Sequence, residues 1–185
     1  MMGGSSDESV APPHHEVACA VCSVPSSEGS VYTRWGSLEC PGGARELYEG
    51  FMASSSYAHS GSGANYICVH ENAQLSSHAS SANNGGGLLY GVESEATGAA
   101  DANVNHDMGC TVCQRPSTTQ TYVQWGRTTC SNGHTLEYEG LVMSTAYNME
   151  KSEFICVDPA RTPHATSSTA NDDGGLLYTV EMMSG

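Results

Sequence analysis

Short stretches of alternating apolar and polar residues predict β-strands in this chain. In residues 31–35, Val31, Thr33 and Trp35 fall on one face, because successive side chains of a strand point to opposite sides. Residues 121–125 repeat this alternation. We find no stretch with the 3.6-residue period of an amphipathic helix of ordinary length. The pattern therefore predicts an all-β protein built of antiparallel strands.

Other strand-like segments also occur as matched pairs. The two members of each pair share several residues in the same order, and one pair is apolar on both faces, as expected of a central strand. The pairs are residues 47–52 and 137–142, residues 66–69 and 154–157, and residues 88–93 and 176–181.

These pairs belong to an internal repeat with a period of about ninety residues. Sliding the chain on itself by this amount superposes Trp35 on Trp125, and we expect each tryptophan to lie at the centre of a core. We predict two tandem small antiparallel β modules. The expected divisions are a flexible or extended lead-in at residues 1–13, module one at 14–94, a linker at 95–104 and module two at 105–185.

Eight cysteines fall at matching positions in the two modules and predict disulfide bonds. A module of this size is marginal on core burial alone, so cross-links would supply stability, and they imply an oxidising, extracellular compartment. The alternative is a four-thiolate zinc site in each module. The cysteines are Cys19, Cys22, Cys40, Cys68, Cys110, Cys113, Cys130 and Cys156.

Four cysteines in a module allow three pairings, which the sequence leaves open. We expect each Cys-x-x-Cys to form one bond with Cys40, or Cys130 in the second module. The other bond would reach Cys68, or Cys156 in the second module.

The charge of the chain excludes several classes of partner. Twenty acidic residues face only six basic ones, for a formal net charge of −14. This balance leaves no basic patch for phosphates, so we expect no nucleic acid and no binding to anionic membranes. No apolar run approaches the length of a membrane span, and we expect no membrane insertion. The first residues lack the apolar core of a signal peptide, so the cysteines alone predict a secreted protein.

Catalytic chemistry has weak support in the sequence. A cysteine nucleophile would need a free thiol and a base such as His15 or His106, whereas the even cysteine count favours disulfides. Redox use of Cys-x-x-Cys would want a βαβ context, which is missing from the predicted elements. We therefore expect no enzyme, no catalytic residue and no cofactor.

Metal binding is a further alternative. Residues 83–86 and 171–174 offer oxygen atoms to calcium, but the first copy has no carboxylate and neither matches an EF-hand. His15–Glu16 and His106–Asp107 could bind a transition metal, although local hydrogen bonding at the start of a strand explains both pairs. We expect turns and no metal site.

Exposed aromatic side chains raise the alternative of a secreted, lectin-like protein that binds glycans. Two linked sites would gain avidity, and aromatic rings stack on sugars. The competing explanation is packing of these rings within the sheet. The candidate side chains are Tyr32, Tyr57, Tyr122 and Tyr147.

The order of short motifs resembles a known family. The motifs are His-Asp-x-x-Cys-x-Val-Cys at 106–113, Tyr-x-x-Trp-Gly-x-x-x-Cys at 122–130, Tyr-x-Gly at 138–140, Tyr-Ile-Cys-Val at 66–69 and Leu-Tyr-x-Val-Glu at 177–181. As a set they resemble the non-collagenous region of the short-chain collagen C4-like proteins of sponges, molluscs and other invertebrates, over about residues 14–183. The resemblance implies a secreted, matrix-associated protein with its cysteines in disulfides and without assigned catalysis. The chain departs from the family name, because its 21 glycines have no Gly-X-Y period.

The leading prediction is an extracellular structural protein of a matrix, filament or adhesive that self-associates as a homo-oligomer or filament. Two like modules in tandem present like surfaces, so a head-to-tail contact between chains can repeat without closing. The lead-in through Pro13 could add a strand to the open sheet edge of a neighbour.

Overall fold

The computed structural model describes residues 18–20, 22–23, 29–75, 86–95, 103–116, 119–165, 167, 171 and 173–183. Over these residues the regular elements are strands and one short 3-10 helix, η2 (Ser131–Gly133). The predicted all-β class is therefore confirmed. The strands are β1 (Val31–Trp35), β2 (Arg45–Ser54), β3 (Ile67–His70), β4 (Tyr90–Ser94), β5 (His106–Asp107), β6 (Gly109–Gln114), β7 (Leu141–Ser144), β8 (Ile155–Val157) and β9 (Gly175–Thr179).

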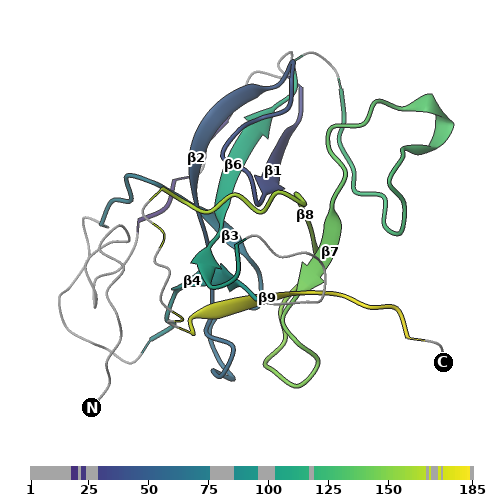
Figure 1. Ribbon diagram of the computed structural model, residues 1–185. Helices are drawn as coiled ribbons and strands as arrows, with labels where there is room; N and C mark the ends of the chain where they lie inside the picture. Colours follow the sequence, from purple (N-terminus) through teal and green to yellow (C-terminus); the bar gives the residue numbers. More distant parts are fainter. Residues whose placement is uncertain are drawn as a thin grey trace.

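Seven of these strands close into one ring, a small barrel (Figure 1). Around the ring the order is β2, β6, β1, β8, β7, β9 and β4, and β4 returns to β2 through the pair Ala53 and Gly91. Strand β3 lies beside β2, and β5 beside β4. The prediction of two separate tandem modules is therefore wrong, because strands from both halves of the repeat share one sheet.

Strand β6 explains how the two halves merge. It follows the second half's His106–Asp107, yet it lies between β1 and β2 of the first half and is antiparallel to both. Cys110 faces Trp35 on one side and Gly50 on the other, and all six residues of β6 are buried. The second half thus supplies the central strand of the first half.

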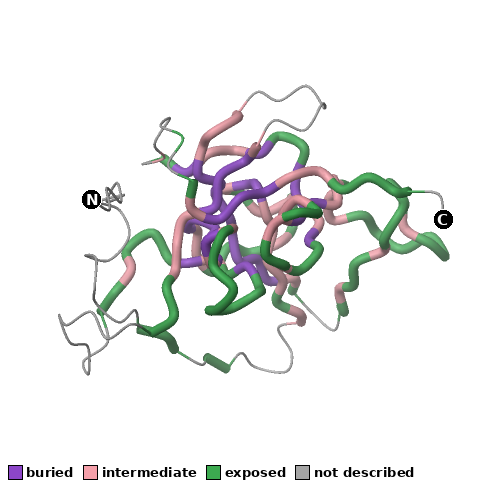
Figure 2. Tube along the Cα trace, turned by 90° about the horizontal axis from the view of Figure 1, so that it is seen from below, coloured by how far each residue is buried: buried purple, intermediate pink, exposed green. Residues whose placement is uncertain are grey.

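A single main core fills the ring, where the buried positions gather in Figure 2. Trp35 is partly buried and does not lie at the centre of this core, although it packs against it. Trp125 does not, because 52% of it is exposed, so the prediction of a core tryptophan in the second half is wrong. The buried members of the core are Met52, Tyr66, Val92, Met108, Cys110, Met143, Ile155, Val157 and Leu177.

The described part of the chain contains no helix with the length and apolarity needed to cross a membrane. The predicted lead-in at residues 1–13 lies outside the described residues, as does most of the predicted linker at 95–104.

Candidate functional site

Two disulfides join the first half of the repeat to the second. Cys40 bonds to Cys113 and Cys68 bonds to Cys110, with Cα atoms 5.7 and 5.8 Å apart. Disulfide bonding is thus confirmed for these four cysteines, but the expected pairing inside each module is wrong. The pairing follows from the place of β6, which carries the second Cys-x-x-Cys into the first half.

The other four cysteines were also predicted to form disulfides within their modules, but in this structure they have free thiols. Cys19 and Cys22 are exposed, whereas Cys130 and Cys156 are partly buried in the second half. Burial, followed by the charge of Asp158, raises the pKa of the Cys156 thiol. These are the four repeat counterparts of the bonded cysteines, so the described residues contain one complete set of disulfides and one set of separated thiols.

An open cleft of about 690 Å³ lies in the second half beside the ring. Its walls are residues 121–124, which belong to the repeat counterpart of β1 at 121–125, and residues 135–140, the counterpart of the first part of β2. Neither segment forms a strand, although both are described throughout. Cys130 and Cys156 both line the cleft. In Figure 1 the chain between β6 and β7 projects from the side of the ring in green.

The walls of the cleft keep the local contacts of their first-half counterparts. The Tyr138 hydroxyl donates to the Cys156 carbonyl at 2.9 Å, as Tyr48 does to Cys68 at 3.2 Å. At the other wall, Gln124 Nε2 donates to the Thr129 carbonyl, and the equivalent Arg34 donates to Glu39. The two walls therefore keep these two hydrogen bonds of the first half, although neither wall forms a strand and no described strand joins them.

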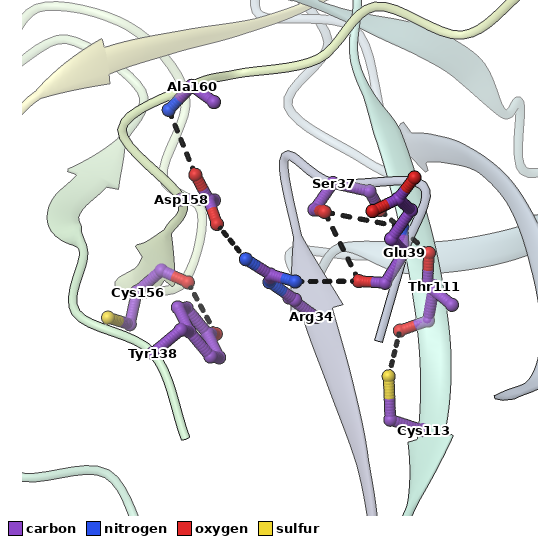
Figure 3. A network of polar contacts seen from close by, with 9 residues as sticks. All are labelled: Arg34, Ser37, Glu39, Thr111, Cys113, Tyr138, Cys156, Asp158 and Ala160. Carbon is purple, nitrogen blue, oxygen red and sulfur yellow. Dashed lines mark hydrogen bonds and ion pairs between the residues drawn. The ribbon is translucent and has the colours of Figure 1, made fainter. Parts of the chain in front are cut away.

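Polar contacts fix the cleft to the first half, as Figure 3 shows. Arg34 Nη2 pairs with Asp158 at 2.5 Å, and its guanidinium lies 5.5 Å from the ring centre of Tyr138. Burial raises the pKa of Tyr138, so its hydroxyl stays protonated and donates to Cys156. This network places the backbone of Cys156 at the base of the cleft.

A second contact lies along the same wall, at residues 135–140. Glu137 accepts from Arg115 Nε at 2.7 Å and from the Tyr32 hydroxyl at 3.0 Å. Burial and this hydrogen bond raise the pKa of Tyr32. The wall at residues 135–140 is thus tied to β1 and to the end of β6.

The four candidate sugar-binding tyrosines do not form two equivalent sites. Tyr32 and Tyr122 both line the cleft, and Tyr122 contacts His134 through its hydroxyl at 3.0 Å. Tyr57 lines a separate pocket of about 370 Å³, and Tyr147 is fully exposed. Glycan binding at these residues stays a prediction.

The candidate metal positions are only partly described. Among the residues that the structure describes, no group of three or more His, Cys, Asp or Glu side chains could hold a metal ion. His106 and Asp107 form β5 and contact the Ser167 hydroxyl through Nδ1 and the backbone N–H, respectively. His15, Glu16 and residues 83–85 lie outside the described part of the chain.

The cleft was not predicted from the sequence, although the sequence contains a signal for it. Each half of the repeat contains one Cys-x-x-Cys segment and one pair of strands able to flank it. We assumed that each segment stays in its own half. Once β6 is seen to fill the first half, the second half lacks a central strand among the described residues.

Comparison with known proteins finds no match: no family model matches the sequence, and neither a curated protein nor a solved structure matches it significantly. The resemblance to short-chain collagen C4-like proteins therefore stays a prediction.

Proposed function

We propose that this protein is a non-catalytic structural building block of an extracellular matrix, filament or adhesive, and that it self-associates head to tail. One observation carries the proposal. The first half is completed by strand β6, which leads into the next half of the repeat, whereas the second half ends in an open cleft.

A comparison of equivalent side chains supports this direction of assembly. Tyr66 of the first half is 4% exposed and bonds to Ser152 of the second half, but its counterpart Phe154 is 61% exposed. Trp35 packs against the core, whereas Trp125 is exposed. Apolar side chains gain free energy when they leave water, at roughly 25 cal/mol per Å². The second half thus exposes the surface that the first half buries.

The turns at two equivalent glycines show the same difference between the halves, namely that the first is covered and the second is open. Gly36 and Gly126 have the same left-handed conformation, with φ of 75° and 76°. A Cβ on Gly36 would lie 2.8 Å from Val157 of the second half, but a Cβ on Gly126 would meet nothing within 4 Å. The turn at Gly126 therefore has the geometry to receive a following module.

Extracellular location rests on the two disulfides, since such bonds persist in oxidising compartments. The rival function is a secreted lectin-like protein, in which Tyr122 at the cleft would stack on a sugar.

The proposal is tested by the mass of the oxidised protein over a range of concentrations. Light scattering after size exclusion should show a mass that rises with concentration, and negative-stain images should show linear assemblies. A stable monomer of 19.4 kDa at high concentration would contradict self-association. If that monomer also eluted from a sugar column with a specific glycan, the lectin function would replace ours.

A further inference from the structure

Residues 18–23, which we call the donor segment, are the repeat counterpart of β6. The donor segment reads Ala-Cys-Ala-Val-Cys-Ser, and β6 reads Gly-Cys-Thr-Val-Cys-Gln. The structure describes the donor segment except for Val21, and none of the described residues belongs to a strand. The Ala18 N–H donates to the Gln74 carbonyl at 3.0 Å, and both cysteines are exposed. The thiols of the donor segment are thus accessible to another molecule.

We propose that the donor segment of a second copy inserts into the cleft as a β-strand, and that disulfides then join Cys19 to Cys156 and Cys22 to Cys130 between the two chains. This inference rests on the proposed self-association and names its contact. The added strand would lie between residues 121–125 and 135–140, as β6 lies between β1 and β2.

The register of β6 predicts where each cysteine of the donor segment would lie. In the first half, Cys110 faces Gly50 of β2. It bonds to Cys68 of β3, which lies on the other side of β2. The counterpart of Gly50 is Gly140, and a Cβ on Gly140 would lie 2.6 Å from the Cys156 sulfur. A cysteine entering opposite Gly140 would therefore arrive beside the Cys156 thiol.

The second bond follows from the other end of the strand. Cys113 faces Tyr32 and bonds to Cys40, which lies in the turn after β1. The counterpart of Cys40 is Cys130, whose thiol lines the cleft and donates to the Thr135 carbonyl. Cys22 would face Tyr122, and the Cys130 thiol would exchange its weak hydrogen bond to Thr135 for a covalent bond to Cys22.

The relation between the two halves indicates that the occupant comes from another chain. Strands β4 and β9, which are counterparts, pair in parallel with Val92 opposite Gly175. The repeat counterpart of Val92 is Val180, so the second half is displaced by five residues along the strand direction, about 16 Å at roughly 3.3 Å per residue. If the two halves of one chain exchanged their Cys-x-x-Cys strands reciprocally, a two-fold axis would relate them. Such an axis does not displace one half along the strand direction relative to the other. The same step repeated leads to a third module, and such heterologous contacts propagate without closing.

The direction of donation agrees with this relation. Strand β6 leads into the second half and fills the first, so each module receives its strand from the module that follows. In the proposed assembly, the first half of a second copy follows the second half, and the donor segment of that copy leads into it. The chain's own donor segment leads into its first half, so in this direction it fills a module of the preceding chain and not the second half of its own chain.

The covalent step needs an oxidant, for which we name a small-molecule disulfide such as oxidised glutathione. One protein thiolate attacks that disulfide and releases one small thiol, and the partner thiolate then displaces the second. For each bond, two protein thiols lose two protons and two electrons, and the small-molecule disulfide is reduced to two thiols. Two such bonds would form at each contact between chains.

Two blocked variants test the contact. The donor-blocked variant, Cys19→Ser with Cys22→Ser, keeps its cleft, and the acceptor-blocked variant, Cys130→Ser with Cys156→Ser, keeps its donor segment. Under oxidised glutathione, each variant alone should stay a single band on a non-reducing gel, whereas the wild type forms a ladder. Mixed one to one, the variants should form a disulfide-linked dimer and nothing larger. A ladder from either variant alone, or no dimer from the mixture, would overturn the assigned pairing.

Isotope mixing keeps the test independent of the folding of the variants. Wild-type chains labelled with ¹⁵N are mixed with unlabelled chains before oxidation, and cross-linked peptides are mapped by mass spectrometry without reduction. We expect peptides joining Cys19 to Cys156 and Cys22 to Cys130, about half of them with one labelled partner. Peptides from a single chain only, or a Cys19–Cys22 bond, would overturn the inference.

The two proposals fail in different ways. Linear assemblies that form without these cross-links would leave self-association standing and would refute the inserted donor segment. A monomer at every concentration, with no cross-link between chains, would refute both.

Discussion

Gly140 passes so close to Cys156 that a Cβ on the glycine would lie 2.6 Å from the cysteine sulfur, and at the same distance from the Val157 carbonyl oxygen. Real Cβ atoms do not approach backbone oxygen this closely. The space over the thiol therefore depends on the missing side chain.

Replacing Gly140 by alanine should destabilise the fold and weaken assembly. The added methyl group must displace Val157 or Cys156, and overpacking of this kind costs about 1–3 kcal/mol. Urea denaturation of the monomer, with its two disulfides intact and its other four thiols free, gives the change in stability. The non-reducing gel gives the yield of linked chains. Gly42→Ala is the matched control, since a Cβ there meets nothing within 4 Å. Equal effects of the two variants would contradict the packing described at Gly140.

Removing the carboxylate of Asp158 should loosen the contact between the halves. Asp158→Asn leaves the Arg34 guanidinium without its ion pair while both side chains remain mostly buried. We expect a loss of about 1–3 kcal/mol in the free energy of unfolding, because a buried charge is left without its partner. Arg127→Ala is the control, since its contact with Thr129 is exposed and should change stability by less than about 0.5 kcal/mol. A neutral Asp158→Asn would show that the ion pair does not hold the halves together.

Alkylation of Cys156 should be slow at neutral pH and should rise steeply at alkaline pH. Burial raises the pKa of this thiol above its ordinary value of 9.0, so at any lower pH less of it is thiolate, which is the reactive form. Iodoacetamide labelling from pH 7 to pH 10, followed by mass spectrometry, measures the profile. The exposed Cys19 in the same molecule is the internal comparison. In urea, where burial is lost, the Cys156 profile should shift to lower pH, and an unchanged profile would contradict the burial of the thiol.

The raised pKa also predicts how this thiol affects stability. A cysteine whose folded-state pKa is above its unfolded value favours folding in its neutral form. That contribution is fully present below about pH 9, near the unfolded pKa, and is lost as pH rises through the folded pKa. The monomer with its two disulfides intact and Cys156 free should therefore lose stability above about pH 9, and Cys156→Ala should reduce this loss.

Salt should accelerate assembly of this acidic chain. With a net charge of −14, two copies repel each other at low ionic strength. Raising salt from about 0.01 M to about 1 M shortens the Debye length from about 30 Å to about 3 Å, which screens the repulsion. Light scattering should report faster growth at high salt for the wild type. The donor-blocked variant is the control, and its scattering should respond much less.

Several features of the fold could be predicted from the sequence. The alternation in residues 31–35 predicts β1, and the apolar run at 66–69 predicts β3 within one residue. Disulfide bonding followed from the number of cysteines. These predictions succeed because period-two patterning and cysteine pairing depend on residues whose types are visible in the sequence.

Other features of the fold depended on which half of the repeat supplies each neighbouring strand. The alternation at residues 121–125 predicts a strand, but the described structure has none there, because among the described residues the second half has no counterpart of β6 to pair with. For the same reason Trp125 is exposed while Trp35 packs on the core. A strand needs a partner for its backbone hydrogen bonds, and sequence pattern alone does not supply one.

The sequence by itself thus determined the all-β class, the repeat and the cysteines that can pair. Only the tertiary structure decided that Cys110 and Cys113 bond to Cys68 and Cys40 across the repeat, and that the second half keeps an open cleft. The physical reason is the repeat itself. Two similar Cys-x-x-Cys segments can make similar contacts in either half, so local pattern cannot choose between them, and the choice depends on how the two halves are displaced along the shared sheet.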